Sequence, residues 1–233
     1  MGGWYSANLA TAAERCSRPK VAPRPAAWLD ELNALAGRRR DVCRHFSAAL
    51  HEVPAEIDAA DGRWLALGQW VASLGAAPRV VEIGCGRGRY LRRLAEAFPH
   101  SELMGIDASA ALLRDLPPQA LAVRGDMLAV PLRDGSCDGA FCVEALEHAL
   151  LPRRAVAALC RVVRPGGGVL VIDKNAAYQP LSDCQPWERW FTDHEMTQWL
   201  GAHGTLVTAQ AIAHGNAARP SGLFRCWTAV RSA

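Results

Sequence analysis

The chain has 233 residues, of which 50% are hydrophobic and 21% are charged, and its formal net charge is +3. This is the composition of an ordinary globular protein, so it excludes a disordered, collagen-like or coiled-coil chain. The sequence holds no apolar run near the roughly 20 residues of a membrane span, and no secretory signal pattern. We therefore expect a cytoplasmic protein without a membrane partner, and the small net charge does not favour nucleic acid as a partner.

The spacing of the cysteines and the small number of lysines are both informative. Eight cysteines are scattered along the chain without a C-x-x-C pair, which excludes the usual zinc-ligand spacings. A cytosolic chain keeps such cysteines reduced. Only Lys20 and Lys174 are lysines among the 26 basic residues. Together with the abundant alanine, this usage is typical of a GC-rich bacterial genome.

The first part of the chain predicts helices. Residues 1–26 are rich in Ala, Pro and Arg without a clear period, so we expect a loose N-terminal arm. Apolar residues recur every three or four positions over 28–50, which indicates one helix, or two helices broken at Gly37–Arg40. Pro54 ends this pattern, and a second helical pattern covers residues 57–74.

Beyond residue 78, short β-rich runs alternate with helical segments. The expected strands are Arg79–Ile83, Glu102–Ile106, Leu121–Val123, Gly139–Val143 and Val169–Ile172. The expected helices between them are Arg89–Phe98, Ser109–Leu116 and Pro152–Val163. Such alternation of apolar strands with helices is typical of a parallel sheet that is covered on both faces.

The last part of the chain has a different pattern. Residues 193–203 predict a helix, and residues 205–213 and 223–231 predict two strands that pair antiparallel. The expected fold class is therefore α/β, a doubly wound, mainly parallel sheet with an antiparallel strand pair at its C-terminal end and a helical cap before it. We expect an arm over residues 1–26, the cap over 27–61 and a single domain over 62–233.

A glycine loop is the strongest functional signal. The strand at residues 79–83 leads into Gly84, Gly86 and Gly88, and a helix follows at once. Glycines allow a tight turn and a close backbone approach to a ligand, and the helix N-terminus offers free N–H groups. The next strand ends at Asp107, about 20 residues on, where an acid can bind both hydroxyls of a ribose. The alternative for the glycines alone is a tight turn without a ligand.

The residues around the loop discriminate between nucleotides. A nicotinamide or flavin site has the spacing G-x-G-x-x-G, whereas here Arg89 stands at the last glycine position. Glu82 lies two residues before the first glycine, and its carboxylate would repel a pyrophosphate. A ligand with a cationic amino group and no pyrophosphate suits this acid, and S-adenosylmethionine is such a ligand.

The chain resembles the class I S-adenosylmethionine-dependent methyltransferases. The resemblance covers roughly residues 62–231 and rests on five motifs in the family's order, which are VVEIGCGRG, GID, RGDM, SCDGAFCVEALEH and VVRPGGGVLVID. It implies a seven-stranded Rossmann-like fold, with S-adenosylmethionine as cofactor and S-adenosylhomocysteine as product. The implied cofactor-binding residues are Glu82, Gly84, Cys85, Gly86, Asp107, Ala108, Asp126, Met127, Cys142 and Val143.

Three residues of the loop leave their roles open. Arg87 and Arg89 flank a site for a sulfonium cation, so each points either outward or toward the ligand's carboxylate. Cys85 lies between two of the glycines and is better explained as a small packing residue than as a catalytic thiol.

His148 is the candidate catalytic residue. It follows the fourth strand, whose carboxyl end faces the ligand crevice in open α/β sheets, and its imidazole suits proton removal near neutral pH. The alternative is a structural turn in which His148 bonds to backbone. The string EALEH also resembles that of ubiquinone-pathway catechol O-methyltransferases, in which Glu144, Glu147 and His148 would correspond to a magnesium site. The string is common, so the prediction includes no metal.

Aromatic residues indicate where a substrate would bind. Tyr178, Trp187, Trp190 and Phe191 follow the fifth strand, and they predict an aromatic wall for a planar or cationic small molecule. The alternative is that the two tryptophans and the phenylalanine dock this segment on the sheet. Lys174 and Asn175 directly follow the fifth strand, where they would either orient a substrate or be solvated.

The leading functional hypothesis is methyl transfer to an oxygen or nitrogen of a small molecule, in the biosynthesis of a specialised metabolite or cofactor. The alternatives are a tRNA, RNA or protein methyltransferase, a non-catalytic cofactor-binding scaffold, and a nicotinamide oxidoreductase. Residues 1–60 carry eight Lys/Arg and seven Asp/Glu, so the cap is not a basic arm. The sequence leaves the oligomeric state open, a homodimer included.

Overall fold

The computed structural model describes residues 26–181, 185–213 and 222–232. The chain divides into two compact units, residues 1–37 and 38–233. Helix α1 (Ala26–Ala48) begins in the first unit and is continuous through Gly37–Arg40, so the structure has one helix there rather than two. The expected arm lies almost wholly outside the described residues, and the division into arm, cap and domain stays a prediction.

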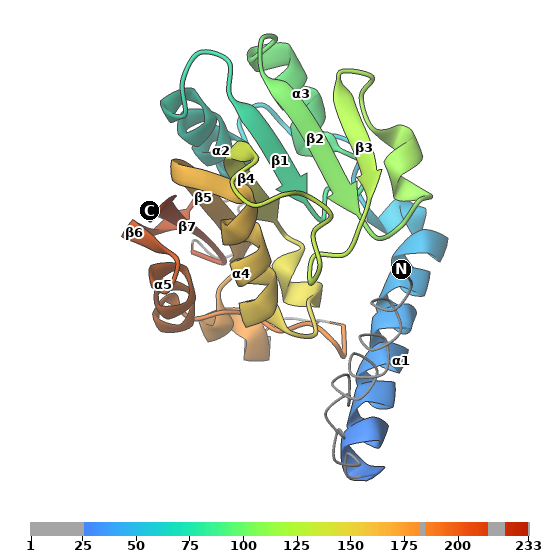
Figure 1. Ribbon diagram of the computed structural model, residues 1–233. Helices are drawn as coiled ribbons and strands as arrows, with labels where there is room; N and C mark the ends of the chain where they lie inside the picture. Colours follow the sequence, from blue (N-terminus) through green and yellow to red (C-terminus); the bar gives the residue numbers. More distant parts are fainter. Residues whose placement is uncertain (1–25, 182–184, 214–221, 233) are drawn as a thin grey trace, which may run out of the picture. The chain divides into compact units, whose positions relative to one another are not determined.

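The second unit is built on one seven-stranded sheet (Figure 1). Its strands are β1 (Arg79–Ile83), β2 (Glu102–Asp107), β3 (Ala120–Arg124), β4 (Cys137–Val143), β5 (Val163–Lys174), β6 (Gly204–Ile212) and β7 (Phe224–Arg231). They lie side by side in the order β3-β2-β1-β4-β5-β7-β6. Strands β1 to β5 are parallel, and β7 pairs antiparallel with both β5 and β6. The predicted fold class is therefore confirmed.

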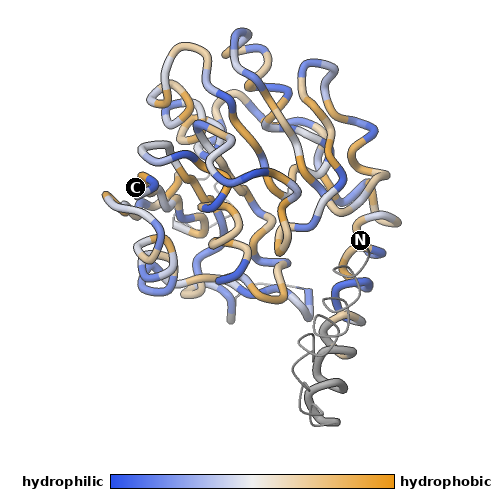
Figure 2. Tube along the Cα trace, viewed as in Figure 1, coloured by the Kyte–Doolittle hydropathy of each residue, from blue (hydrophilic) through white to orange (hydrophobic). Residues whose placement is uncertain are grey.

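Helices cover both faces of the sheet. They are α2 (Gly62–Ser73), α3 (Arg89–Ala97), α4 (Pro152–Val162) and α5 (Asp193–Gly201), with short 3₁₀ helices at Leu50–Glu52, Leu112–Asp115, Leu146–His148 and Ala176–Leu181. Helices α4 and α5 pack on one face, and α2 and α3 pack on the other (Figure 1). The apolar stretches of the strands run through the interior between these two layers (Figure 2).

The alternation of side chains along each strand fills both layers. In β1, Val81 packs with the α4–α5 layer and Val80 with the α2–α3 layer. In β5, Val171 packs with the α4–α5 layer and Leu170 with the α2–α3 layer. Successive residues of a strand point to opposite faces, so a strand that is apolar at every position is buried on both. This burial on both faces holds the ends of the strands in position, and the candidate site lies at those ends.

Two predicted helices are shorter in the structure. The expected helix over residues 57–74 begins only at Gly62, because the Asp61 side chain accepts the N–H of Arg63 and caps the helix there. The expected helix Ser109–Leu116 is reduced to the 3₁₀ turn Leu112–Asp115. Leu116 precedes a proline, and the residue before a proline disfavours the helical conformation.

The strand order places the site. It reverses between β1 and β4, so the connections that leave these two neighbouring strands diverge and open a crevice at their carboxyl ends. Among the described residues, no helix is both long and apolar enough to cross a membrane.

Candidate functional site

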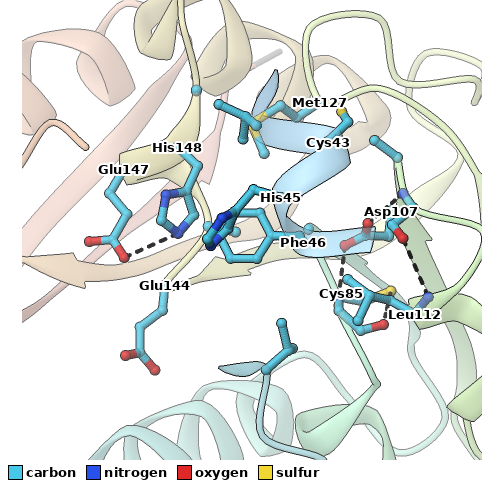
Figure 3. A pocket seen from close by; sticks show the side chains of 18 of the residues that line it. Cys43, His45, Phe46, Cys85, Asp107, Leu112, Met127, Glu144, Glu147 and His148 are labelled. Atoms are coloured by element: carbon cyan, nitrogen blue, oxygen red, sulfur yellow. Dashed lines mark hydrogen bonds and ion pairs between the residues drawn. The ribbon is translucent and has the colours of Figure 1, made fainter. Parts of the chain in front are cut away.

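A cavity of about 590 Å³ lies at the carboxyl ends of the parallel strands. Its walls come from the second half of α1, the glycine loop after β1, the end of β2, the turn after β4 and the end of β5. Figure 3 shows Asp107 and Cys85 on one side, Glu147 and His148 on the other, and His45 and Phe46 of α1 between them. The cavity therefore has one end at Asp107, the predicted ribose-binding acid, and another at His148, the candidate base.

The backbone of the glycine loop has a conformation that residues with side chains rarely adopt. Gly84, Gly86 and Gly88 have φ values of 78°, 54° and 74°. The N–H of Gly84 donates to the Ile106 carbonyl of the neighbouring strand at 2.8 Å. A Cβ on Gly84 would lie 2.4 Å from the Cβ of Ala145. The loop thus depends on glycine for its backbone conformation and for its close approach to the turn after β4.

Replacing Gly84 with alanine is expected to lower the free energy of unfolding by about 2 kcal/mol or more, because the added methyl is strained at positive φ and meets Ala145. Gly75→Ala is the matched control, since Gly75 has a φ of 123° and nothing near its Cβ position. Urea denaturation of both variants would separate the two effects. An equal loss in the two variants would show that the contact with Ala145 contributes nothing.

Asp107 ties the end of β2 to the glycine loop. Its Oδ2 accepts the N–H of Gly86 at 2.9 Å, and its Oδ1 accepts the N–H of Ser109 at 2.8 Å. Burial raises the pKa of this carboxyl above its usual value, while backbone N–H groups that include those of Ser109 and Gly86 oppose the rise. The carboxylate lines the cavity next to Ala108 with lone pairs left for a ligand.

Asp126 and Met127 line the same end of the cavity. The Oδ1 of Asp126 accepts the N–H of Leu128 at 3.0 Å, and its Oδ2 forms an ion pair with Arg39 of α1. Helix α1 makes a second contact here, since the Ser47 and Ser109 hydroxyls lie 2.8 Å apart. The second half of α1 thus forms part of the cavity wall on the side of Asp107 and Asp126.

A buried group of two arginines and an acid stands beside the glycine loop. The Oε2 of Glu144 accepts from the Nη1 of Arg63 at 2.6 Å and from the Nη2 of Arg89. Arg63 also binds Asp61 through two nitrogens. Burial would raise the pKa of Glu144, but Arg89 and Arg63 outweigh it and lower that pKa. Glu144 has a φ of 50°, a left-handed conformation that is uncommon outside glycine and that aims its carboxylate at both guanidinium groups.

The structure shows that the two arginines of the glycine loop point in different directions. Arg89 lines the cavity, and among the described residues only its Nη2 has a hydrogen-bond partner, so other N–H donors are left for a ligand. Arg87 is turned away from the cavity, where its guanidinium binds Asp115 at 2.6 Å and the Val53 carbonyl at 3.4 Å.

The opposite end of the cavity holds the candidate base. The Nε2 of His148 lies 3.5 Å from the Oε1 of Glu147, and the Nζ of Lys174 lies 3.0 Å from that oxygen and 3.3 Å from the Oε2 of Glu188. Burial, with a contribution from the Lys174 charge, lowers the pKa of His148 to about 4. The imidazole is therefore neutral near pH 7 and keeps a free lone pair, while burial makes it a weaker base than an ordinary histidine.

Two acidic side chains and one histidine at this end of the cavity are close enough together to hold a metal ion. One ligand atom each from Glu147, His148 and Glu188 lie within 4.8 Å of one another. The trio that the sequence resemblance implied is different, because Glu144 is engaged by its two arginines. The Lys174 ammonium contacts two of the three residues. The absence of a metal stays a prediction.

Most of the predicted cofactor residues come together. Gly84, Cys85, Gly86, Asp107, Ala108, Asp126 and Met127 all line the cavity, as does His148. Glu82, Cys142 and Val143 are buried in the strands behind it and do not line it. Contacts between these residues and a cofactor stay predictions.

The predicted aromatic wall is placed differently. None of Tyr178, Trp187, Trp190 and Phe191 is among the residues that line the cavity. Phe191 is fully buried and packs against Trp199, and the indole N–H of Trp190 donates to Glu188 at 3.2 Å. This placement favours the alternative in which the segment docks on the sheet. Trp187 lies nearer the site, since its ring contacts that of His45.

The sequence reasoning missed the contribution of α1. Cys43, His45 and Phe46 line the cavity, and the Phe46 ring centre lies 4.7 Å from that of His148. It also missed Arg63 and Glu188, and left Lys174 undecided. The recurrence of Val42, Cys43 and Phe46 on one face of the helix was the available signal, but periodicity shows an apolar face without showing what it covers.

Comparisons with known proteins add to the evidence from this geometry. A family model described as a methyltransferase domain matches residues 81–171, the segment that runs from β1 into β5 and includes the glycine loop, Asp107 and Asp126. The chain carries a class I S-adenosylmethionine-dependent methyltransferase domain. The resemblance inferred from the sequence is thereby confirmed.

Several methyltransferases are similar to this chain. It is 28% identical over 128 residues to the ubiquinone/menaquinone biosynthesis C-methyltransferase UbiE of Syntrophotalea carbinolica, which covers 52% of this chain and 54% of that protein. It is 31% identical over 137 residues to tRNA (carboxymethyluridine(34)-5-O)-methyltransferase ALKBH8 of Mus musculus, which covers 56% and 18%. A solved S-adenosylmethionine-dependent methyltransferase from Thermotoga maritima has a TM-score of 0.58 at 19% identity, over 83% of this chain and 96% of that chain. The chain thus spans only part of each of these two curated relatives.

The methyltransferase domain has residues that fit S-adenosylmethionine, the cofactor of the family. Gly84 and Gly86 line the cavity without side chains, and Asp107 has lone pairs for ribose hydroxyls. The free donors of Arg89 suit the carboxylate of the methionine part. Glu82 is fully buried beneath the loop, its Oε2 has no partner among the described residues, and burial raises its pKa well above the usual value. Glu82 does not line the cavity, so its contact with the ammonium group of the cofactor stays a prediction.

Proposed function

We propose that the protein transfers a methyl group from S-adenosylmethionine to an oxygen or nitrogen of a small molecule, in the cytoplasm and in the biosynthesis of a specialised metabolite or cofactor. The observation that carries the proposal is the cavity, which joins Asp107 at one end to His148 at the other. Its volume of about 590 Å³ is in the range of small-molecule sites. Helix α1 covers part of it, which suits a compact acceptor better than a polymer.

The residues of the chain divide the work of the reaction. When bound, the cofactor supplies a methyl group on a sulfonium sulfur, which leaves as S-adenosylhomocysteine. Asp107 and Asp126 orient its nucleoside part, while Arg89 holds its carboxylate. His148 accepts the proton that the acceptor atom loses as its lone pair bonds to the methyl carbon. Holding donor and acceptor in line supplies much of the rate enhancement.

A nucleic-acid substrate is the second candidate, and one observation favours it. A tRNA methyltransferase is among the curated relatives. Against it, residues 1–60 carry a nearly balanced charge, with eight Lys/Arg and seven Asp/Glu. The wall of the cavity at His148 is also acidic, since Glu52, Glu147 and Glu188 line it. Acidic walls repel a phosphate backbone.

The proposal is tested with S-adenosylmethionine that carries a labelled methyl group. The protein is incubated with a small-molecule extract and, separately, with total tRNA, and His148→Gln is run beside it. We expect label in the small-molecule fraction and a loss of about 100-fold or more in the variant. Label in tRNA, with the steep salt dependence of nucleic-acid binding, would support the second candidate instead. Cofactor binding without transfer to either pool would support a scaffold.

A further inference from the structure

The end of the cavity at His148 contains more buried acidic than basic side chains. Glu147 and Glu188 have side chains that are 3% and 8% exposed, and the Lys174 ammonium is the one cation that contacts them among the described residues. Asp173 is fully buried beside them, where it accepts the N–H groups of Glu147 and Lys174. Two acidic side chains therefore share one ammonium group, and a third acidic side chain lies beside them.

Within the part of the chain that the structure describes, the other basic side chains that line the cavity are paired elsewhere. Arg63 and Arg89 are paired with Glu144, and His45 is paired with Glu52. Burial and the charge of Asp173 raise the pKa of Glu147 to about 10. An excess of buried carboxylates is costly unless it takes up a proton or a cation.

Two buried polar atoms at this end lack partners within the described part of the chain. The Oε2 of Glu147 and the Nδ1 of His148 have no hydrogen-bond partner among the described residues. Both residues line the cavity, where Figure 3 shows them side by side next to Phe46. Buried polar atoms in native proteins are nearly always paired, so these two atoms point to a ligand that donates hydrogen bonds.

Aromatic rings complete the surroundings. The Phe46 ring centre lies 4.7 Å from the His148 ring, and the His45 ring centre lies 5.1 Å from that of Trp187. The faces of aromatic rings carry partial negative charge and attract cations. Carboxylates, unpaired acceptors and aromatic faces thus all favour the same kind of ligand.

We propose that the methyl-acceptor substrate carries a protonated amine or amidine group, which Glu147 and Glu188 hold beside Phe46 and His148. This inference rests on the proposed function, whose acceptor it makes specific. A protonated amine has no lone pair, so this nitrogen anchors the substrate. The atom that receives the methyl is a separate, neutral oxygen or nitrogen of the same molecule.

The test compares three probes of similar shape and different charge: benzylamine, benzyl alcohol and benzoate. The full-length protein is first saturated with S-adenosylhomocysteine, and each probe is titrated near neutral pH by saturation-transfer NMR. We expect benzylamine to bind at least about tenfold more tightly than benzyl alcohol, and benzoate not to bind. Lys174→Met should tighten benzylamine binding, because it removes the competing ammonium.

Variants of the acids locate the site. Glu188→Gln should weaken benzylamine binding at least about tenfold, whereas Glu102→Gln, at an exposed acid on β2 outside the cavity, should leave it unchanged. Binding of S-adenosylhomocysteine reports folding in every variant. Failure to bind S-adenosylhomocysteine in the unmodified protein would count against the proposed function itself.

Three results would overturn the inference while leaving the proposed function intact. The first is binding of benzyl alcohol or benzoate as tight as that of benzylamine. The second is unchanged benzylamine binding in Glu188→Gln. The third is magnesium chloride that displaces benzylamine and binds in a manner dependent on Glu188, which would assign the acids to a metal ion instead.

Discussion

Replacing Asp107 with alanine is expected to weaken the binding of S-adenosylhomocysteine by about 100- to 10,000-fold. A carboxylate that binds two ribose hydroxyls makes two charge-assisted hydrogen bonds, each contributing about 1.5–3 kcal/mol. The same carboxylate also holds the glycine loop, since it accepts the N–H of Gly86 at 2.9 Å. Its removal therefore takes away a ligand contact and the support of the loop together.

Isothermal titration calorimetry measures this effect directly. Asp107→Asn separates its two causes, because the amide oxygen can still accept the Gly86 N–H while the charge is lost, so we expect an intermediate affinity. Asp134→Ala is the control, since Asp134 is exposed and binds Arg161 away from the cavity. NADH should not bind any of these proteins. An affinity of Asp107→Ala within twofold of the unmodified protein would remove Asp107 from the cofactor site.

The fold could be predicted from the sequence because its signals are local and repeated. Strand β1 is apolar at consecutive positions and leads into three glycines, so its type, its end and the turn after it were all predictable. The ends of helices that depend on a single side chain were harder to predict. The start of α2 depends on the Asp61 cap, and the 3₁₀ turn Leu112–Asp115 replaces a full helix that the apolar period alone favoured.

The candidate site was predictable where strand ends supply it. Gly84 and Gly86 follow β1 and Asp107 ends β2, and a parallel sheet brings these strand ends together. The Arg63–Glu144 pair joins residues 81 positions apart, and Lys174 meets Glu188 across a loop. Such pairs depend on the packing of segments that are distant in sequence, and nothing in either segment alone indicates its partner. The tryptophan and phenylalanine at 190 and 191 show the reverse, because an aromatic cluster looks the same whether it binds a ligand or fills a core.

Replacing Glu144 with leucine is expected to lower the free energy of unfolding by about 3–5 kcal/mol at neutral pH. The change leaves Arg63 and Arg89, whose side chains are 11% and 15% exposed, without the acid between them. Removing one partner of a buried ion pair costs this much because the remaining charge stays buried. The left-handed backbone at this position is present in both proteins, so its cost largely cancels.

The pH dependence of this loss gives a second test. The pKa of Glu144 is lowered in the folded protein, so its contribution is complete above the ordinary value of 4.5 and disappears as the pH falls through the folded pKa. Urea denaturation of the two proteins should therefore differ most near pH 7 and converge in acid. Glu102→Leu is the control, because the Arg79–Glu102 pair is exposed to solvent and should contribute little to stability. Equal losses in the two variants would mean that burial adds nothing to the Glu144 pair.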